Sequence, residues 1–173
     1  MPPFARTALA AALALAGPAF AQEAQTASGT ITGTIDLDDA RWVLSAPESA
    51  EGSTWRDRGG TTEVRLVGRP EPGATRDSGR LVLTFTADTG VQAAEVQDAR
   101  ATFRRDGQRY AAEGANLDLT LSALEPEGQD VAVAGSFVAR LAPGGATGDL
   151  RIETEGPVID GNFQGTVPAA PEG

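Results

Sequence analysis

The chain contains no cysteine and no histidine, and all 14 of its basic residues are arginine because lysine is absent as well. The missing cysteine excludes disulfides, thiol nucleophiles, thiolate metal sites and the lipid anchor that bacterial lipoproteins carry on a cysteine. The missing histidine and lysine exclude imidazole catalysis, the usual zinc sites, lysine-based phosphate binding and Schiff-base chemistry. We therefore expect a protein that is not an enzyme and that needs no cofactor.

Positive charge is scarce, since 14 arginines stand against 24 acidic residues and the net charge is −10 at pH 7. The arginines are scattered among acidic residues along the sequence, whereas nucleic-acid binding depends on a basic patch that neutralises phosphates. An anionic membrane surface is disfavoured for the same reason. We expect no nucleic-acid partner, and the acidic excess is typical of a soluble domain.

Long apolar runs are also missing, apart from the one at residues 7–16. This run follows Arg6 and precedes Ala-Phe-Ala at residues 19–21, which is the small-x-small pattern of a signal-peptide cleavage site. It is too short for a membrane-spanning helix, which takes about 20 residues. The sequence predicts a secretory signal peptide at residues 1–21, cleavage before Gln22, a periplasmic or extracellular location and no membrane span.

The rest of the chain has the periodicity of β-strands. Residues 29–35 alternate threonine with isoleucine and glycine, which is typical of a strand with one buried face. Similar segments between Gly-, Pro- and Asp-containing turns predict strands at about 29–35, 40–45, 61–67, 80–87, 91–97, 99–105, 108–112, 116–123, 130–141, 148–154 and 158–167. The predicted organisation is a flexible segment at 22–28, a single β-domain at 29–167 and a flexible C-terminal tail at 168–173.

The turn at Asp106–Gly107 is the strongest local signal. A two-residue Asp-Gly link supplies the positive φ values of a tight hairpin, so it predicts that the flanking strands pair. Because evenly spaced strands follow one another without intervening helices, we expect an all-β domain of about 9–11 short strands and no substantial helix. An antiparallel β-sandwich is the first expectation, and a closed or partly open β-barrel is the alternative. Residues 91–97 and 99–105 would also suit a short helix.

Alternate apolar positions of these strands predict the core. The residues expected to point inward are Ile31, Ile35, Trp42, Leu44, Val64, Leu66, Leu81, Leu83, Phe85, Phe103, Leu117, Leu119, Leu121, Val131, Val133, Phe137, Leu141, Leu150, Ile152, Val158, Phe163 and Val167.

The polar segment at residues 45–60 is the first candidate for a binding site. It is long for a loop without structure of its own, and such loops are often functional. It carries Trp55 beside Arg56 and Arg58, which together would make an exposed ring bordered by hydrogen-bonding groups, suited to a small ligand or a glycan. The alternative interpretation is that Trp55 caps the edge of the sheet.

Two groups of carboxylates complete the set of candidates. Asp36, Asp38 and Asp39 follow the first predicted strand, where three hard oxygen ligands could bind calcium, the alternative being an ordinary acidic turn. Glu63 and Asp118 lie on the polar faces of predicted strands, where a pair of carboxylates about 5 to 9.5 Å apart could cleave glycosides. The alternative for both is the solvated face of a sheet.

The absences and the strand pattern together favour a non-catalytic β-domain with a binding or structural role in the cell envelope. Its partner would be an envelope protein or a surface component. A small-ligand or glycan-binding module centred on Trp55 and a carboxylate-dependent hydrolase are the alternatives. The fold alone does not decide among them, because β-sandwiches have many unrelated activities.

Cleavage before Gln22 is directly testable. We expect the protein recovered from an expressing Gram-negative host to lack residues 1–21 and to leave the cytoplasm, because the charged start, apolar run and Ala-Phe-Ala pattern are together recognised for export. Intact-mass spectrometry of the fractionated cells measures this. Recovery of the chain with residues 1–21 still attached would contradict both the processing and the location.

Overall fold

The computed structural model describes residues 28–46, 51–73, 79–88, 94–144 and 156–171. The predicted signal peptide and the strand expected at 148–154 lie outside the described residues. Within them the elements are β1 (Ser28–Ile35), β2 (Asp38–Leu44), β3 (Thr54–Asp57), β4 (Thr61–Pro70), β5 (Arg80–Asp88), β6 (Val96–Arg105), β7 (Gln108–Glu113), the 3₁₀ turn η1 (Gly114–Asn116), β8 (Leu117–Glu127), β9 (Asp130–Arg140), β10 (Ala142–Pro143) and β11 (Val158–Pro168).

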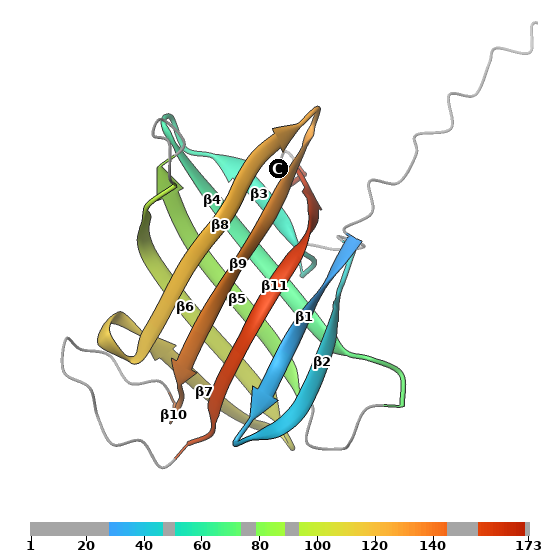
Figure 1. Cartoon of the computed structure of the whole chain (residues 1–173), viewed down its shortest axis with the longest axis vertical. Helices are drawn as coiled ribbons and strands as arrows, with labels where there is room; N and C mark the ends of the chain where they lie inside the picture. Colours follow the sequence, from blue (N-terminus) through green and yellow to red (C-terminus); the bar gives the residue numbers. More distant parts are fainter. Residues whose placement is uncertain (1–27, 47–50, 74–78, 89–93, 145–155, 172–173) are drawn as a thin grey trace, which may run out of the picture.

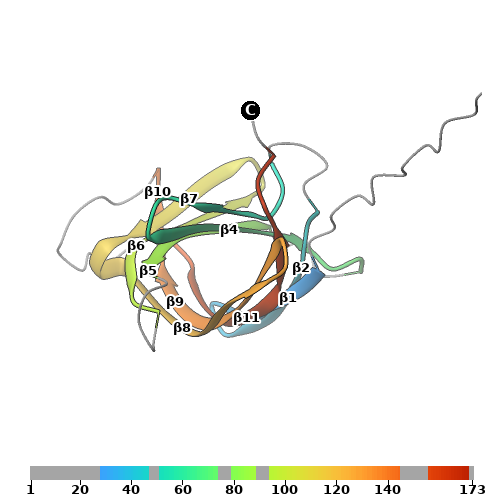
Figure 2. The ribbon, with the colours of Figure 1, turned by 90° about the horizontal axis from the view of Figure 1, so that it is seen from above.

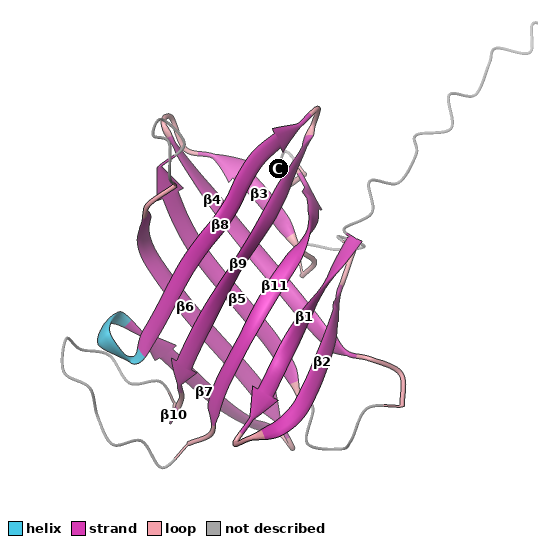
Figure 3. Cartoon of the chain, in the orientation of Figure 1, coloured by secondary structure: helices cyan, strands magenta, loops and turns pink. Residues whose placement is uncertain are grey.

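The strands form one antiparallel sheet (Figures 1 and 3). Its order is β10-β7-β6-β5-β4-β2-β1-β11-β9-β8, with β3 added beside β4. The runs β7-β6-β5-β4, β2-β1 and β9-β8 are neighbours both in the sheet and in the sequence, as in a meander. The longest connection in sequence is made by β11, which returns to pair with the whole of β1, from Ser28 opposite Thr166 to Ile35 opposite Ile159.

The sheet curls around its own apolar face (Figure 2). The wall that contains β4 and β5 faces the wall that contains β11, β9 and β8 across the core. Strands β6 and β8 come into contact, but in the described part of the chain no ladder joins them, so the sheet is a half-barrel that is open on one side. The prediction of an all-β antiparallel domain is confirmed. Within the described residues, no helix has the length and apolar character needed to cross a membrane.

Alternation along the strands builds the core, as expected from the sequence. Trp42 is fully buried at its centre, and its indole Nε1–H donates to the carbonyl of Gly79 at 2.7 Å. Gly68 makes room for this ring, because a Cβ on Gly68 would lie only 2.9 Å from the Cβ of Trp42. Leu150 and Ile152 lie outside the described residues, and Leu119 and Leu121 are partly buried against the core. The other predicted core residues in the described chain are buried, with one exception.

That exception is Val158, which is 40% exposed, while the next residue, Ile159, is fully buried. The prediction for Val158 was wrong by one position. Successive side chains of a strand point to opposite faces, so the register of β11 against β1 decides which of the two apolar residues faces inward. The sequence alone does not show which of the two residues faces inward.

The hairpin at Asp106–Gly107 is confirmed. Arg105 pairs with Gln108, and the two turn residues have φ values of +52° and +79°. The link between β1 and β2 is also a two-residue turn, in which Asp36 and Leu37 have φ values of +52° and +78°. Asp36 is of a residue type that adopts this conformation more readily than most, and its carboxylate accepts the amide of Val158 at the start of β11.

Several strand ends differ from the predicted ones by one to four residues, the short strand β10 was not predicted, and two predicted segments have a different structure. Residues 91–93 lie outside the described residues, and from Val96 to Arg105 the chain is the single strand β6 and not two strands, with a bulge opposite Thr86 and Ala87 that absorbs the irregular pattern. The segment at 45–60 was expected to have no structure of its own, yet it contains β3. A four-residue strand with two charged residues carries too weak a pattern to be recognised, and β3 exists because β4 offers it an edge.

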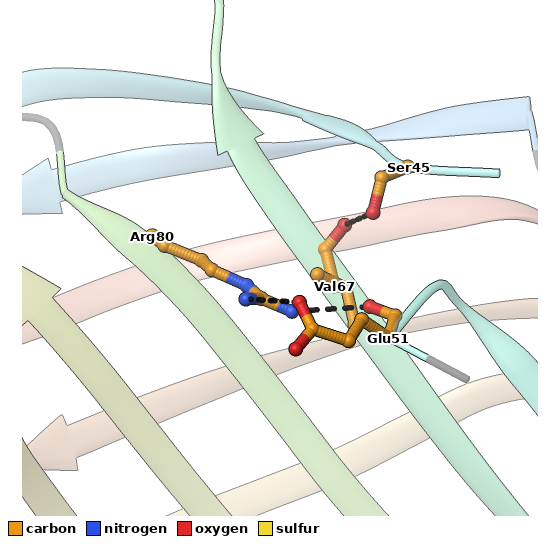
Figure 4. A network of polar contacts seen from close by, with 4 residues as sticks. All are labelled: Ser45, Glu51, Val67 and Arg80. Atoms are coloured by element: carbon orange, nitrogen blue, oxygen red, sulfur yellow. Dashed lines mark hydrogen bonds and ion pairs between the residues drawn. The ribbon is translucent and has the colours of Figure 1, made fainter. Parts of the chain in front are cut away.

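Strand β4 shares this edge between two partners. Its last residues pair with β2 and its first residues with β3, which leaves Val67 between the two ladders. Ser45 and Ser53 fill the gap, and Figure 4 shows the contact of Ser45 with Val67. The amide of Val67 donates to the hydroxyl of Ser53 at 2.9 Å, and the carbonyl of Val67 accepts the amide of Ser45 at 2.9 Å and its hydroxyl at 3.2 Å.

The connection between β2 and β3 is also fixed to the outside of β5. Arg80 donates from Nη1 to the carboxylate of Glu51 and from Nη2 to the backbone carbonyl of Glu51, both at 3.1 Å (Figure 4). This contact and the hydrogen bonds of Val67 hold the start of β3 in one place. Strand β3 therefore has a defined position over one end of the barrel.

Candidate functional site

One end of the barrel holds a pocket of about 270 Å³, which we call the mouth. Its walls come from β3 and β4 on one side and from β8 and β9 on the other, so it lies between the two walls of the curled sheet. The residues that line it are Trp55, Asp57, Gly60, Thr62, Leu124, Pro126 and Val131. An indole and three aliphatic side chains thus surround a space that also has a carboxylate and a hydroxyl.

Pairing of β3 with β4 turns Trp55 into the mouth. Trp55 stands opposite Val64, which is fully buried, so both side chains point toward the inside of the barrel. The next pair, Arg56 and Glu63, points outward, and the pair after it, Asp57 and Thr62, points inward again. The period of two therefore places Trp55 and Asp57 in the same pocket.

Trp55 is held by three elements. Its indole Nε1–H donates to the carbonyl of Gln129 in the β8–β9 turn at 3.1 Å. Its own carbonyl accepts the amide of Ala170 at 2.8 Å, next to a parallel bridge to Ala169. The ring is partly buried against the core. Trp55 therefore caps the edge of the sheet and lines a pocket, whereas the fully exposed ring that the sequence also allowed is not present.

The C-terminal residues contribute to this arrangement. Residues 168–170 were expected to begin a flexible tail, but Pro168 ends β11 and the two alanines that follow lie against β3. These backbone contacts cannot be recognised from an Ala-rich sequence, because they need no particular side chain. They close the barrel mouth on the side of β11.

The three residues predicted to bind a ligand do not come together. Arg56 points away from Trp55 and is exposed. Arg58 forms an ion pair with Glu63 on the outer surface, at 2.6 Å between Nη2 and Oε2. Of the predicted trio only Trp55 lines the mouth, and the polar groups beside it are Asp57 and Thr62.

The opposite wall of the mouth was missed by the sequence analysis. Leu124 and Pro126 belong to the end of β8, and Val131 to the start of β9. The sequence Glu125-Pro126-Glu127-Gly128 indicated only a turn, and nothing in it shows that this turn lies across the barrel from Trp55. The turn comes to lie across the barrel from Trp55 only because β11 pairs with β1 and so joins β8 and β9 to the rest of the sheet.

Among the described lining residues, Asp57 supplies the carboxylate of the mouth. It accepts the amide of Gly59 at 2.8 Å, which orients the carboxylate beside the pocket. Glu125 and Glu127 alternate with the lining residues Leu124 and Pro126 along β8, so their side chains point to the outer face of the sheet. The carboxylate of Asp57 makes the mouth better suited to an uncharged or cationic ligand than to an anion.

The three aspartates proposed for calcium occupy the β1–β2 hairpin. The carboxylate of Asp36 accepts the amide of Val158 at 2.9 Å, and Asp38 and Asp39 are neighbours on one strand, so their side chains point to opposite faces. Among the described residues no three carboxylates are grouped so that they could hold a metal ion. The geometry does not gather these ligands, and calcium binding stays a prediction.

The two carboxylates considered for hydrolysis are also separate. Glu63 lies on β4 in the ion pair with Arg58, and Asp118 lies on β8 with Arg140 at 3.3 Å. These strands are not neighbours in the sheet and belong to opposite walls (Figure 2). The described side chains give no paired-carboxylate centre from these two residues.

Comparison with known proteins gives no match: no family model, no curated protein and no solved structure is significantly similar to the chain.

The position of Trp55 predicts its contribution to stability. We expect Trp55→Ala to lower the free energy of unfolding by roughly 2 to 3 kcal/mol, below the 3 to 5 kcal/mol of a fully buried aromatic ring, because Trp55 is only partly buried. Trp55→Phe retains most of the packing and should cost about 1 kcal/mol for the lost hydrogen bond to Gln129. Denaturant melts of both variants measure this. A parent-like midpoint for Trp55→Ala would show that the ring does not cap the barrel.

Proposed function

We propose that the protein is a non-catalytic binding domain of the cell envelope or extracellular space, and that the mouth binds one ring of a small uncharged ligand. A sugar unit of a surface glycan is the class that fits best. The observation that supports the proposal is the lining of the mouth, in which Trp55 lies beside Leu124, Pro126 and Val131. Asp57 and Thr62 add polar groups to the same pocket.

The size of the mouth limits the ligand. Sites for drug-sized molecules usually have volumes of about 300 to 1,000 Å³, and the mouth, at about 270 Å³, lies just below this range. It accommodates a single ring, such as the terminal unit of a longer glycan. Larger parts of the ligand would remain outside.

The chemistry of the lining favours a ring with an apolar face and polar edges. The indole of Trp55 already uses its N–H on Gln129, so its π-face is what it can offer a ligand. A carbohydrate ring would place its C–H face on the indole and its hydroxyl groups toward Asp57 and Thr62. The carboxylate of Asp57 accepts hydrogen bonds from hydroxyls, and its negative charge disfavours anionic ligands.

The lining supports binding without catalysis. Among the described residues that line the mouth, Asp57 is the only ionisable one. Glycoside hydrolysis needs two carboxyl groups with different roles, and the lining provides one. The envelope location is part of the proposal and rests on the signal-peptide pattern of residues 1–21.

The proposal is tested by fluorescence titration of a Trp42→Phe variant, in which Trp55 is the single emitting tryptophan. We expect a saturable change in emission with at least one member of a panel of neutral mono- and disaccharides at millimolar concentration. Asp57→Asn in the same background should weaken that binding about tenfold, because a charged acceptor strengthens a hydrogen bond by roughly 1 to 2 kcal/mol.

Arg56→Gln, on the outward face of the same strand, is the matched control and should bind as the parent does. Circular dichroism of each variant shows that it is folded. A folded Trp42→Phe protein whose emission does not change with any sugar of the panel would contradict the proposal. The same holds if Arg56→Gln weakens binding as much as Asp57→Asn.

A further inference from the structure

Five of the arginines that are scattered in the sequence lie on one outer wall of the barrel. Arg80, Arg104 and Arg109 stand directly opposite one another on β5, β6 and β7. Four residues further along β5, on the same face, Thr84 is paired with both Arg65 and Arg100. The sequence separates these residues by up to 44 positions, and only the register of four strands brings them together. The expectation that the arginines are dispersed holds for the sequence and not for the surface.

The wall has a pocket of about 320 Å³. Val82 and Thr102, which are paired neighbours of β5 and β6, form its floor, and Arg65, Arg80, Arg104 and Arg109 surround it. Among the lining residues that the structure describes, Glu51 is the only acidic one, and it is bound by Arg80. The described lining thus brings four guanidinium groups and one carboxylate to a single cavity, in a protein whose overall charge is −10.

This arrangement is unfavourable by itself. Like charges directly opposite each other on neighbouring strands destabilise a sheet, and here three such residues are consecutive. Within the described part of the chain, no carboxylate lies at ion-pair distance from Arg104 or Arg109, and both are exposed. Arg80 uses its two terminal nitrogens on Glu51, while its Nε is a buried donor without an acceptor. Among the described residues, Glu51 is thus the one carboxylate in an ion pair with the row Arg80, Arg104 and Arg109.

We propose that this wall is a second binding site, separate from the mouth, for a ligand that carries at least two oxyanion groups. The planar guanidinium groups of arginine match carboxylate and phosphate groups with two parallel hydrogen bonds. Adjacent strands lie about 4.8 Å apart, so the row from Arg80 to Arg109 presents its charges at short, regular intervals. The hydroxyl of Thr102 adds a neutral donor on the floor. The ligand is a free multivalent anion or one repeat of an anionic polymer.

The test measures the melting temperature and binding by calorimetry with three probes at equal ionic strength. Citrate represents a free multivalent carboxylate, polygalacturonate a carboxylated polymer, and sodium chloride controls for screening. We expect citrate or polygalacturonate to raise the melting temperature above that in sodium chloride, because a ligand of the folded state stabilises it. A response to citrate identifies a site for free anions, and a response to the polymer alone identifies a polymer site.

Substitutions separate the site from general charge effects. Arg104→Gln and Arg109→Gln should each weaken binding roughly tenfold, as expected for loss of a charge-assisted hydrogen bond. Without anion both variants should be at least as stable as the parent, since like-charge repulsion is relieved. Arg140→Gln removes one charge from the opposite wall and should leave binding within about twofold of the parent, far less than the tenfold that one charge-assisted contact represents.

The proposal is overturned if neither citrate nor polygalacturonate binds the folded parent more tightly than chloride does. It is equally overturned if Arg140→Gln weakens binding as much as Arg104→Gln, since the effect would then follow net charge alone. Trp55 variants should leave anion binding unchanged, so failure of this site and failure of the mouth are distinguished.

Discussion

The arrangement of the molecule depends on how the edge of β4 is shared between its two partners, β2 and β3. A backbone N–H or C=O buried without a partner costs about 1 to 3 kcal/mol, and Val67 would leave both groups unpaired between the ladders of β2 and β3. Ser53 is fully buried and supplies a hydroxyl that accepts from the amide of Val67, while Ser45 donates to its carbonyl. This small polar junction lets the chain leave β2, pass outside the sheet and return to β4 as β3.

The position of β3 in turn creates the mouth and places a carboxylate at the border of the arginine wall. On the inner face, its alternation places Trp55 and Asp57 opposite the β8–β9 turn and so forms the mouth. On the outer face, the segment that leads to β3 brings Glu51 to Arg80, at the border of the arginine wall. A largely apolar cavity with the carboxylate of Asp57 and a basic surface thus occur on opposite faces of one sheet. The two sites have complementary preferences, the mouth for uncharged groups and the wall for anions.

The sequence predicts the strands, turns and most of the core, and it misses the features that depend on which distant strands pair. Alternation of apolar residues predicts most strands and most of the core, and the Asp106–Gly107 turn predicts its hairpin, because these features are set by neighbours in the chain. The mouth is different, since Trp55 and Leu124 meet only after β11 pairs with β1. The arginine wall likewise depends on the register of β4 to β7. Val158 is a smaller example of the same limit. It and Ile159 are adjacent apolar residues, and only the register of β11 decides which of them is buried.

Hydrogen exchange of the Val67 amide tests the central claim most directly. In the parent this amide should be strongly protected from exchange. Ser53→Ala removes its hydrogen-bond acceptor without removing a charge, so in this variant the Val67 amide should exchange much faster. The amides that pair β3 with β4 should also exchange faster. The amide of Leu83, in the centre of β5, is the internal control and should keep its protection in both proteins. Equal protection of Val67 in the parent and in Ser53→Ala would contradict the account, because β3 would then hold its place without the serine junction.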